Sequence, residues 1–247
     1  MIQSLPNKNS WVQEFVTTDR YKKISSAVKK FASENVVVTF DRKTVITLPR
    51  DRQFASNILD LQPFYILDFI SNNTDKEIWD IGCGSNWFKE AYNIIGVDPY
   101  NDKADIKDSF DTNFIKKYKN SLDNAISICA IHFCSIDTLE NRILSFIDLV
   151  KSGGFVYIAI NFARVIDSTQ IFLDSKSKII SNEKLISNLE TMEEKLEIFK
   201  KSPEKVEEFI EDIVKKIKDN IILKEYSIKE DPDDALNGNF RILIQKR

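Results

Sequence analysis

The stretch Asp-Ile-Gly-Cys-Gly-Ser-Asn occupies residues 80–86 and closes a short apolar run that begins at residue 77. The chain has only six glycines in 247 residues, and Gly82 and Gly84 both stand in this one turn. Glycines at the end of a strand permit a tight turn and let a ligand approach the backbone, because no Cβ is in the way. The stretch therefore predicts a ligand-binding turn after the first strand of an α/β domain.

A second apolar run covers residues 94–97 and is followed by Asp98 and Pro99. An acid at the end of the second strand is placed to accept hydrogen bonds from the ribose hydroxyls of a nucleotide. A dinucleotide-binding turn would need a third glycine at position 87, which is tryptophan here, and a more distant acid. The pattern therefore favours a different nucleotide-like ligand.

The same alternation of apolar runs and helical patterns continues along the chain. Strands are predicted at residues 77–81, 94–97, 104–106, 125–131 and 155–160, and helices at residues 87–92, 113–119 and 137–150. Repeated strand–helix–strand units require right-handed crossovers and a parallel sheet covered by helices. We therefore predict a doubly wound, mostly parallel α/β sheet that ends in a strand–loop–strand tail at residues 221–245.

Two further segments accompany this domain. Residues 1–55 are predicted to be an attachment with a helix capped by Thr18 and a β-hairpin, and residues 56–247 the main α/β domain. Residues 182–220 are predicted to form an inserted helical hairpin. The apolar seam of its first arm is expected to cover the neighbouring helix, the mouth of the site, or the same helix of a second copy, in that order. This seam consists of Leu185, Leu189, Met192, Leu196 and Phe199.

The turn at residues 80–86 resembles the D-x-G-x-G-x-G turn of class I S-adenosylmethionine-dependent methyltransferases, with Asn86 in the position of the third glycine. Residues 96–99, 104–108, 123–133 and 149–156 are similar to further motifs of that family, in the same order along the chain. The resemblance implies a class I methyltransferase-like Rossmann fold and S-adenosyl-L-methionine as the cofactor.

The resemblance also implies roles for particular residues. Asp80 would hold the ammonium group of the cofactor and Asp98 its ribose, while Asp108, or in its place Asp105, would meet the adenine amine. His132, the only histidine, follows the fourth strand, where the catalytic face of the family lies, and is the candidate catalytic residue. The full set of expected cofactor-binding residues is Asp80, Gly82, Cys83, Gly84, Asp98, Pro99, Asp108, Ser109 and Cys129.

The expected activity is in-line transfer of a methyl group to a small-molecule acceptor. A sulfonium already carries a good leaving group, so positioning of the acceptor supplies most of the acceleration. A base matters only when the acceptor must lose a proton. The alternative is a catalytically inactive methyltransferase-like subunit that serves binding or assembly, and the sequence does not identify the acceptor.

Composition and charge exclude several other classes. A net charge of -3 and a pI near 5.5 argue against a broad nucleic-acid footprint. The longest apolar run, residues 155–160, is far shorter than the ~20 residues that cross a bilayer. The N-terminus lacks the pattern of a secretory signal, so we expect a cytoplasmic protein. Three cysteines and a single histidine predict neither a disulfide framework nor a metal site.

Overall fold

The computed structural model describes residues 5–33, 36–40, 44–48, 62–84, 86–128, 130–176, 183–218, 221–231 and 234–247. The chain divides into two compact units, Met1–Ser109 and Phe110–Arg247. The domain boundary expected between residues 55 and 56 lies outside the described residues. The first unit holds the glycine turn, and the second holds His132.

The first unit is built on two parallel strands. The strand β3 (Ile78–Ile81) pairs with β4 (Ile94–Val97), and β3 is buried along its whole length, which explains its continuous apolar sequence. The short helix predicted at residues 87–92 is present as a single 3-10 turn, η1 (Trp87–Glu90).

The brief strand predicted at residues 104–106 is reduced to one residue, since only Ile106 forms an isolated parallel bridge, to Val97. The side chain of Asp105 explains why the strand stops there. The backbone N–H of Gly96 donates to Oδ2 of Asp105 at 2.9 Å, so a carboxylate takes the hydrogen bond that a longer strand would have accepted. The backbone therefore leaves the ladder after one bridge.

Two helices and a hairpin precede this strand pair; the second helix and the hairpin are as predicted, whereas the first helix is not predicted by the sequence. They are α1 (Lys8–Phe15), α2 (Asp19–Ser33) and the antiparallel strands β1 (Val36–Phe40) and β2 (Thr44–Leu48), and they are followed by α4 (Gln62–Asn73). Thr18 caps α2 as expected, since its Oγ1 accepts the backbone N–H of Tyr21 at 3.1 Å.

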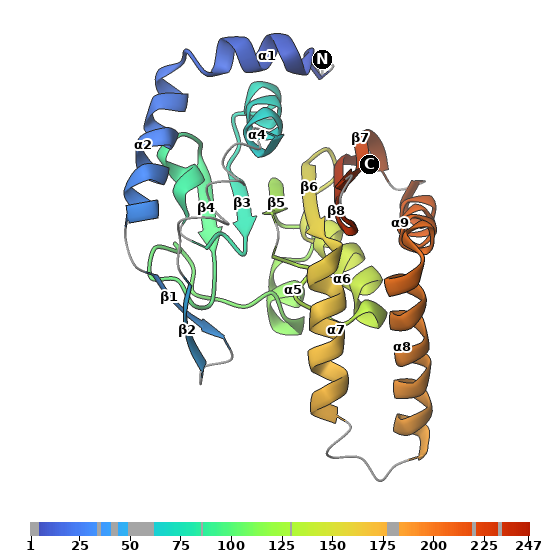
Figure 1. Cartoon of the computed structure of the whole chain (residues 1–247). Coiled ribbons are helices and arrows are strands. Elements are labelled where there is room, and N and C mark those ends of the chain that lie inside the picture. The colour runs from blue at the N-terminus through green and yellow to red at the C-terminus, as the bar shows by residue number, and fades with distance from the viewer. Residues whose placement is uncertain are drawn as a thin grey trace. The chain divides into compact units, whose positions relative to one another are not determined.

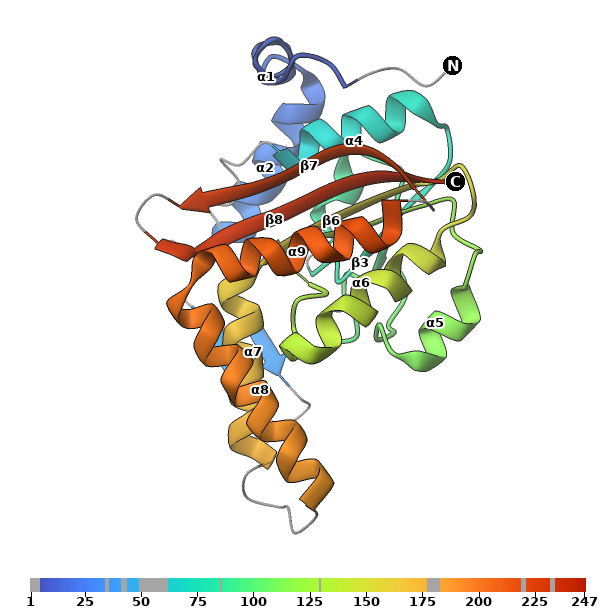
Figure 2. The same cartoon turned by 90° about the vertical axis from the view of Figure 1, so that its right-hand side faces the viewer.

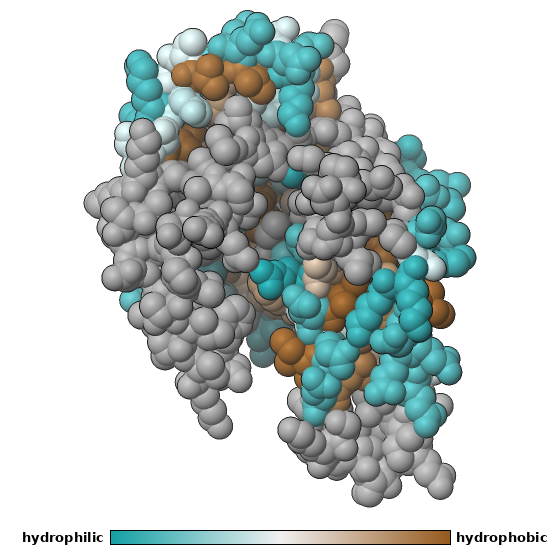
Figure 3. Space-filling model, in the orientation of Figure 1, coloured by the Kyte–Doolittle hydropathy of each residue, from teal (hydrophilic) through white to brown (hydrophobic). Residues whose placement is uncertain are grey.

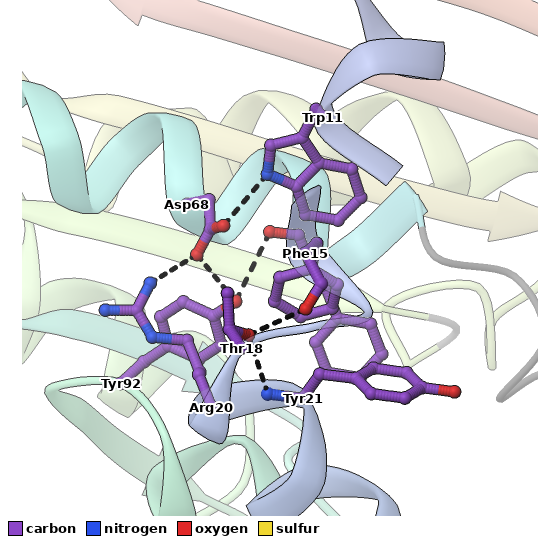
Figure 4. Close-up of polar contacts among 8 residues, drawn as sticks. Trp11, Phe15, Thr18, Arg20, Tyr21, Asp68 and Tyr92 are labelled. Atoms are coloured by element: carbon purple, nitrogen blue, oxygen red, sulfur yellow. Dashed lines mark hydrogen bonds and ion pairs between the residues drawn. The ribbon is translucent and has the colours of Figure 1, made fainter. Parts of the chain in front are cut away.

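One carboxylate on α4 ties the N-terminal helices to the rest of the first unit (Figure 4). Asp68 accepts from the indole N–H of Trp11 on α1 and from the hydroxyl of Tyr92, both at 2.9 Å, and pairs with Arg20 on α2. The side chain of Asp68 is only 13% exposed. Charge-assisted hydrogen bonds of this kind are stronger than neutral ones. The N-terminal segment is therefore an integral part of the first unit.

The second unit contains four neighbouring strands in the order β5 (Asn124–Ile128), β6 (Phe155–Asn161), β8 (Asp234–Lys246) and β7 (Ile221–Asp231). The β5–β6 pair is parallel, whereas β6–β8 and β7–β8 are antiparallel. The helix α6 (Ile136–Leu149) connects β5 to β6, and α5 (Thr112–Tyr118) precedes β5. Parallel strands joined by crossovers, with an antiparallel hairpin at the end, confirm the predicted Rossmann-like α/β class.

The helix α6 does not begin with the local capping box that the spacing of Asp137 and Glu140 would allow. The N-cap is Ser135, without a side-chain cap bond, and the hydroxyl of Thr169 accepts the N–H of Ile136 at 3.0 Å. Glu140 instead pairs with Lys216 at 2.8 Å. A tertiary contact therefore takes the place of the local one.

Three long helices complete the second unit: α7 (Phe162–Lys176), α8 (Glu183–Lys201) and α9 (Pro203–Ile217). Figures 1 and 2 show α7 and α8 side by side and α9 alongside the C-terminal strands. Figure 3 shows apolar surface between charged side chains over α7 and α8. No described helix is long and apolar enough to cross a membrane.

The described half of the α8 seam faces its neighbours within the unit. Met192, Leu196 and Phe199 are buried, and the Phe199 ring lies 6.0 Å from that of Phe162 and 5.7 Å from that of Phe209. These contacts agree with the first-ranked partner, the neighbouring helix. The side chains of Leu185 and Leu189 lie outside the described residues.

Candidate functional site

In the turn after β3, every second residue has a left-handed backbone conformation. Gly82, Gly84 and Asn86 have φ values of 81°, 50° and 53°. Glycine adopts this region freely and asparagine tolerates it better than most residues. The backbone N–H groups of Gly82 and Cys83 both donate to the carbonyl of Val97, at 2.7 and 3.1 Å. The turn therefore bends back onto the carboxyl end of β4.

Asp98 stands at that strand end, as the sequence predicts. Its Oδ2 accepts the backbone N–H of Gly84 at 3.1 Å, and its Oδ1 accepts those of Tyr100 and Asn101 at 2.9 and 3.0 Å. An ionised carboxylate offers about four lone-pair positions. Oδ2, with one N–H partner, keeps a position for one further hydrogen-bond donor.

The buried side chain of Asn86 holds the turn in place through its hydrogen bonds to Lys103 and Asp105, which we call the brace. Its Nδ2 donates to the carbonyl of Lys103 and to Oδ2 of Asp105, both at 3.0 Å. The same Oδ2 accepts the N–H of Gly96, and the other carboxylate oxygen pairs with Lys89. The hydrogen bond from Lys89 is the main cause that holds the pKa of Asp105 below its usual range. Both oxygens of Asp105 are therefore engaged in holding the turn.

Gly96 makes room for this brace. A Cβ built on Gly96 would lie 2.4 Å from Cγ and Oδ1 of Asn86, which is far inside contact distance. Sequence reasoning noted Asn86 only as a replacement for a glycine and missed its bond to Asp105. The available signal was the glycine inside the second strand, since such a glycine often marks a close approach of another group.

Asp80, the last but one residue of β3, is 2% exposed. Within the part of the chain that the structure describes, no hydrogen bond reaches its carboxyl group. Burial, and after it the nearby charge of Asp98, raises the pKa of Asp80 to about 7. A buried carboxylate without a partner is costly, so the ionised form favours a cation as its ligand.

The remaining residues expected in the first unit have less specific surroundings. Burial raises the pKa of the Cys83 thiol far above its usual range, so this side chain is a neutral, apolar wall. Asp108 accepts the N–H of Ser109 at 2.8 Å, and both residues, like Pro99, are half-buried. Cys129 lies outside the described residues.

His132 lies in the second unit, in the loop after β5, and is 2% exposed. The backbone N–H of Asn161, the last residue of β6, donates to its Nδ1 at 3.2 Å. The ring is therefore held at the carboxyl ends of β5 and β6, where α/β folds bind their ligands. Burial, and after it the charge of Arg164, lowers the pKa of His132 to about 4, so the imidazole is neutral at pH 7.

No group of three or more His, Cys, Asp or Glu side chains among the described residues could hold a metal ion.

The sequence matches no protein-family model and no curated protein. Solved structures do match, among them S-adenosylmethionine-dependent methyltransferases. The 1,6-didemethyltoxoflavin-N1-methyltransferase of Burkholderia thailandensis, in a complex with S-adenosylhomocysteine, is 10% identical; the match covers 100% of this chain and 93% of that one, with a TM-score of 0.43. The plantazolicin methyltransferase BpumL, also with S-adenosylhomocysteine, is 15% identical over 96% of this chain and 99% of that one, with a TM-score of 0.39.

A protein of Methanococcus maripaludis classed as an S-adenosylmethionine-dependent methyltransferase is 20% identical, and the match covers 87% of this chain and 96% of that one, with a TM-score of 0.41. Scores below 0.5 at such low identity leave activity and substrate to be argued from this chain's own residues.

Proposed function

We propose that the protein is an S-adenosyl-L-methionine-dependent methyltransferase with a small-molecule acceptor. The observation that carries the proposal is Asp80: a buried carboxyl group directly before a glycine turn, with no hydrogen-bond partner among the described residues. The amino-acid end of the cofactor carries an ammonium group, which would supply the missing cation. A dinucleotide offers a pyrophosphate near such a turn, and its negative charge would be repelled by Asp80 and Asp98.

The other cofactor contacts follow from the groups that remain available. Asp98 would bind the ribose through Oδ2. Binding both ribose hydroxyls would require replacing the bond from Gly84. Asp105 is engaged with Asn86, Gly96 and Lys89, so Asp108 is the acid that we assign to the adenine amine.

The cofactor supplies a methyl group on a sulfonium that is already a good leaving group. The protein's contribution is then to bind, to orient and to exclude water, because alignment of the two reacting groups provides most of the rate. Asp80 and Asp98 would fix the two ends of the cofactor across the glycine turn. His132 is the residue that we assign to the acceptor.

The binding step has a proton signature that tests the role of Asp80. At pH 6 the Asp80 carboxyl, with a pKa of about 7, is mostly protonated. An ammonium group favours the ionised form, so S-adenosylhomocysteine should release close to one proton on binding at pH 6 and little at pH 8. Calorimetric titration in two buffers of different ionisation enthalpy measures this number directly.

Controls separate this interpretation from nucleotide binding in general. Adenosine lacks the ammonium group, and Asp80→Asn lacks the titrating carboxyl, so neither titration should release the proton. Asp98→Asn keeps the shape of the side chain and should weaken S-adenosylhomocysteine by about 1–3 kcal/mol through the loss of a charged acceptor. Tighter binding of NAD than of S-adenosylhomocysteine would overturn the proposed cofactor.

The alternative is a subunit that binds the cofactor without catalysis, which the changed glycine turn at Asn86 leaves open. Release of S-adenosylhomocysteine from S-adenosyl-L-methionine in the presence of cell extract distinguishes the two functions. Cofactor binding without turnover under these conditions would favour the binding subunit.

A further inference from the structure

We propose that His132 binds the methyl acceptor as a hydrogen-bond donor, through Nε2–H, and that it does not act as a general base. The identity of the ligand as a methyl acceptor rests on the proposed function; the state of the ring does not. The proposal has three supports: the partner of Nδ1, the missing partner of Nε2 and the surrounding side chains.

The partner of Nδ1 fixes the tautomer. A neutral imidazole has one nitrogen that accepts and one that donates. Because Nδ1 accepts the backbone N–H of Asn161 at 3.2 Å, the proton must reside on Nε2. Taking up a second proton would place a new N–H against that of Asn161, and burial opposes the added charge as well. The ring therefore has no free lone pair with which to accept a proton from a substrate.

The Nε2–H group is the unused half of the ring. No described residue accepts it, although His132 is only 2% exposed. Nε2 itself is not fully buried, so a ligand can reach this N–H from outside the protein. A ligand with a lone pair at this point would satisfy it.

The neighbouring side chains define the kind of ligand. The ring of Phe133 lies 4.5 Å from the imidazole and is 51% exposed, so it offers an apolar surface beside the donor. Burial raises the pKa of the Cys134 thiol, so the thiol stays protonated. The guanidinium group of Arg164, which lies near the imidazole, is positively charged and cannot accept a proton. The described residues of this loop, 130–135, include no carboxylate. Nothing in this loop can take a proton at neutral pH.

These observations point to a flat, unsaturated acceptor that presents an unprotonated ring nitrogen or a carbonyl oxygen to Nε2–H. The atom that receives the methyl group must then reach the site with its lone pair already free. Acceptors that need a base, such as a neutral alcohol, fit this arrangement poorly.

The state of the ring can be measured on the full chain without any ligand. Because His132 is the only histidine, protein labelled with 15N-histidine gives one pair of ring nitrogens in a long-range 1H–15N NMR spectrum. The expected result is the Nε2–H tautomer, unchanged from pH 8 to pH 5.5. A proton on Nδ1, or titration with a midpoint between pH 6 and 7, would overturn the proposal.

The ligand class is tested with pyridine and benzene, which have the same shape and differ in one ring lone pair. At pH 8, pyridine should move the Nε2 proton signal to lower field, and benzene should leave it in place. Equal shifts with both, or a shift with neither, would refute the hydrogen-bonding role.

Two variants test the same hydrogen bond through signals of the ligand. Saturation transfer from protein to pyridine should persist in His132→Gln, which keeps an N–H donor near the position of Nε2, and should be lost in His132→Leu. Persistence in His132→Leu, or loss in both variants, would contradict the proposal. Failure of S-adenosylhomocysteine binding in calorimetry would instead overturn the proposed function while leaving these results standing.

Discussion

At the residue scale, Asn86 and Gly96 should behave as a coupled pair. Replacing Gly96 with alanine pushes a methyl group into the Asn86 amide, which two hydrogen bonds hold in place, so Gly96→Ala should cost about 1–3 kcal/mol. In the Asn86→Gly background the obstructing side chain is gone, and position 86 has the φ of 53° that glycine adopts freely. The same alanine should then cost less than about 1 kcal/mol.

Urea unfolding of the wild type, both single variants and the double variant measures this coupling. Additive costs would show that the amide of Asn86 can move aside and that the brace does not hold the turn.

Asp80 should make the stability of the protein fall as the pH rises. In the folded protein its pKa is about 7, whereas an unfolded aspartate titrates near about 4. Between these values the folded state binds more protons, so the free energy of unfolding decreases from pH 4 towards pH 7. A pKa difference of one corresponds to about 1.4 kcal/mol, so this decline amounts to a few kcal/mol.

Asp80→Asn should remove that decline in urea unfolding at pH 5 and pH 7.5. The control is Asp102→Asn, because the pair with Lys107 keeps the pKa of the exposed Asp102 below this range. A pH dependence that survives in Asp80→Asn would place the titrating group elsewhere.

The sequence predicted the positions of Asp80 and Asp98 because each stands at the carboxyl end of an apolar run. It could not predict that Asp105 holds the turn, since that contact depends on the left-handed backbone at Asn86. Nor could it assign the tautomer of His132, which is determined by the backbone N–H of Asn161, far along the chain.

At the element scale, runs of apolar residues predicted strands well where burial is continuous. The second strand has the predicted bounds, residues 94–97, and the helices α5 and α6 lie close to theirs. The elements at residues 87–92 and 104–106 are shorter than predicted, and both adjoin the hydrogen bonds between Asn86 and Asp105. There, side-chain hydrogen bonds replace backbone ones, and hydrophobic periodicity carries no information about that exchange.

The packing of α8 gives a prediction with a matched control. Phe199 is 8% exposed and packs against the rings of Phe162 and Phe209, whereas its neighbour Ile198 is 49% exposed. Phe199→Ala should lower the free energy of unfolding by about 3–5 kcal/mol, as for other buried phenylalanines. Ile198→Ala should change it by less than about 1 kcal/mol.

Thermal unfolding and light scattering together distinguish the partners of the seam. If Phe199→Ala kept its stability but changed a dimer into a monomer, the seam would be an interface between copies and not a contact within the unit.

At the scale of the whole molecule, the division into two compact units has a consequence for ligand binding. All the residues that we assign to the ribose, the adenine and the ammonium group belong to Met1–Ser109, whereas α8 and α9 belong to Phe110–Arg247. A ligand bound to one unit opposes those local opening motions of the backbone that would disrupt its binding site. The effect reaches the other unit only if the two open together.

S-adenosylhomocysteine should therefore slow hydrogen exchange mainly in the first unit. At about 100 times its Kd, a ligand contributes about 2.7 kcal/mol, which allows up to ~100-fold slower exchange. The amides of Gly84, Tyr100 and Asn101, which donate to Asp98, should show the largest effect, and those of α8 should show little. Exchange followed by mass spectrometry, with adenosine as the weaker ligand and Asp98→Asn as the impaired protein, measures both regions at once. Equal protection of α8 would mean that the two units unfold as one, because binding to the first would then stabilise every amide that exchanges by global unfolding.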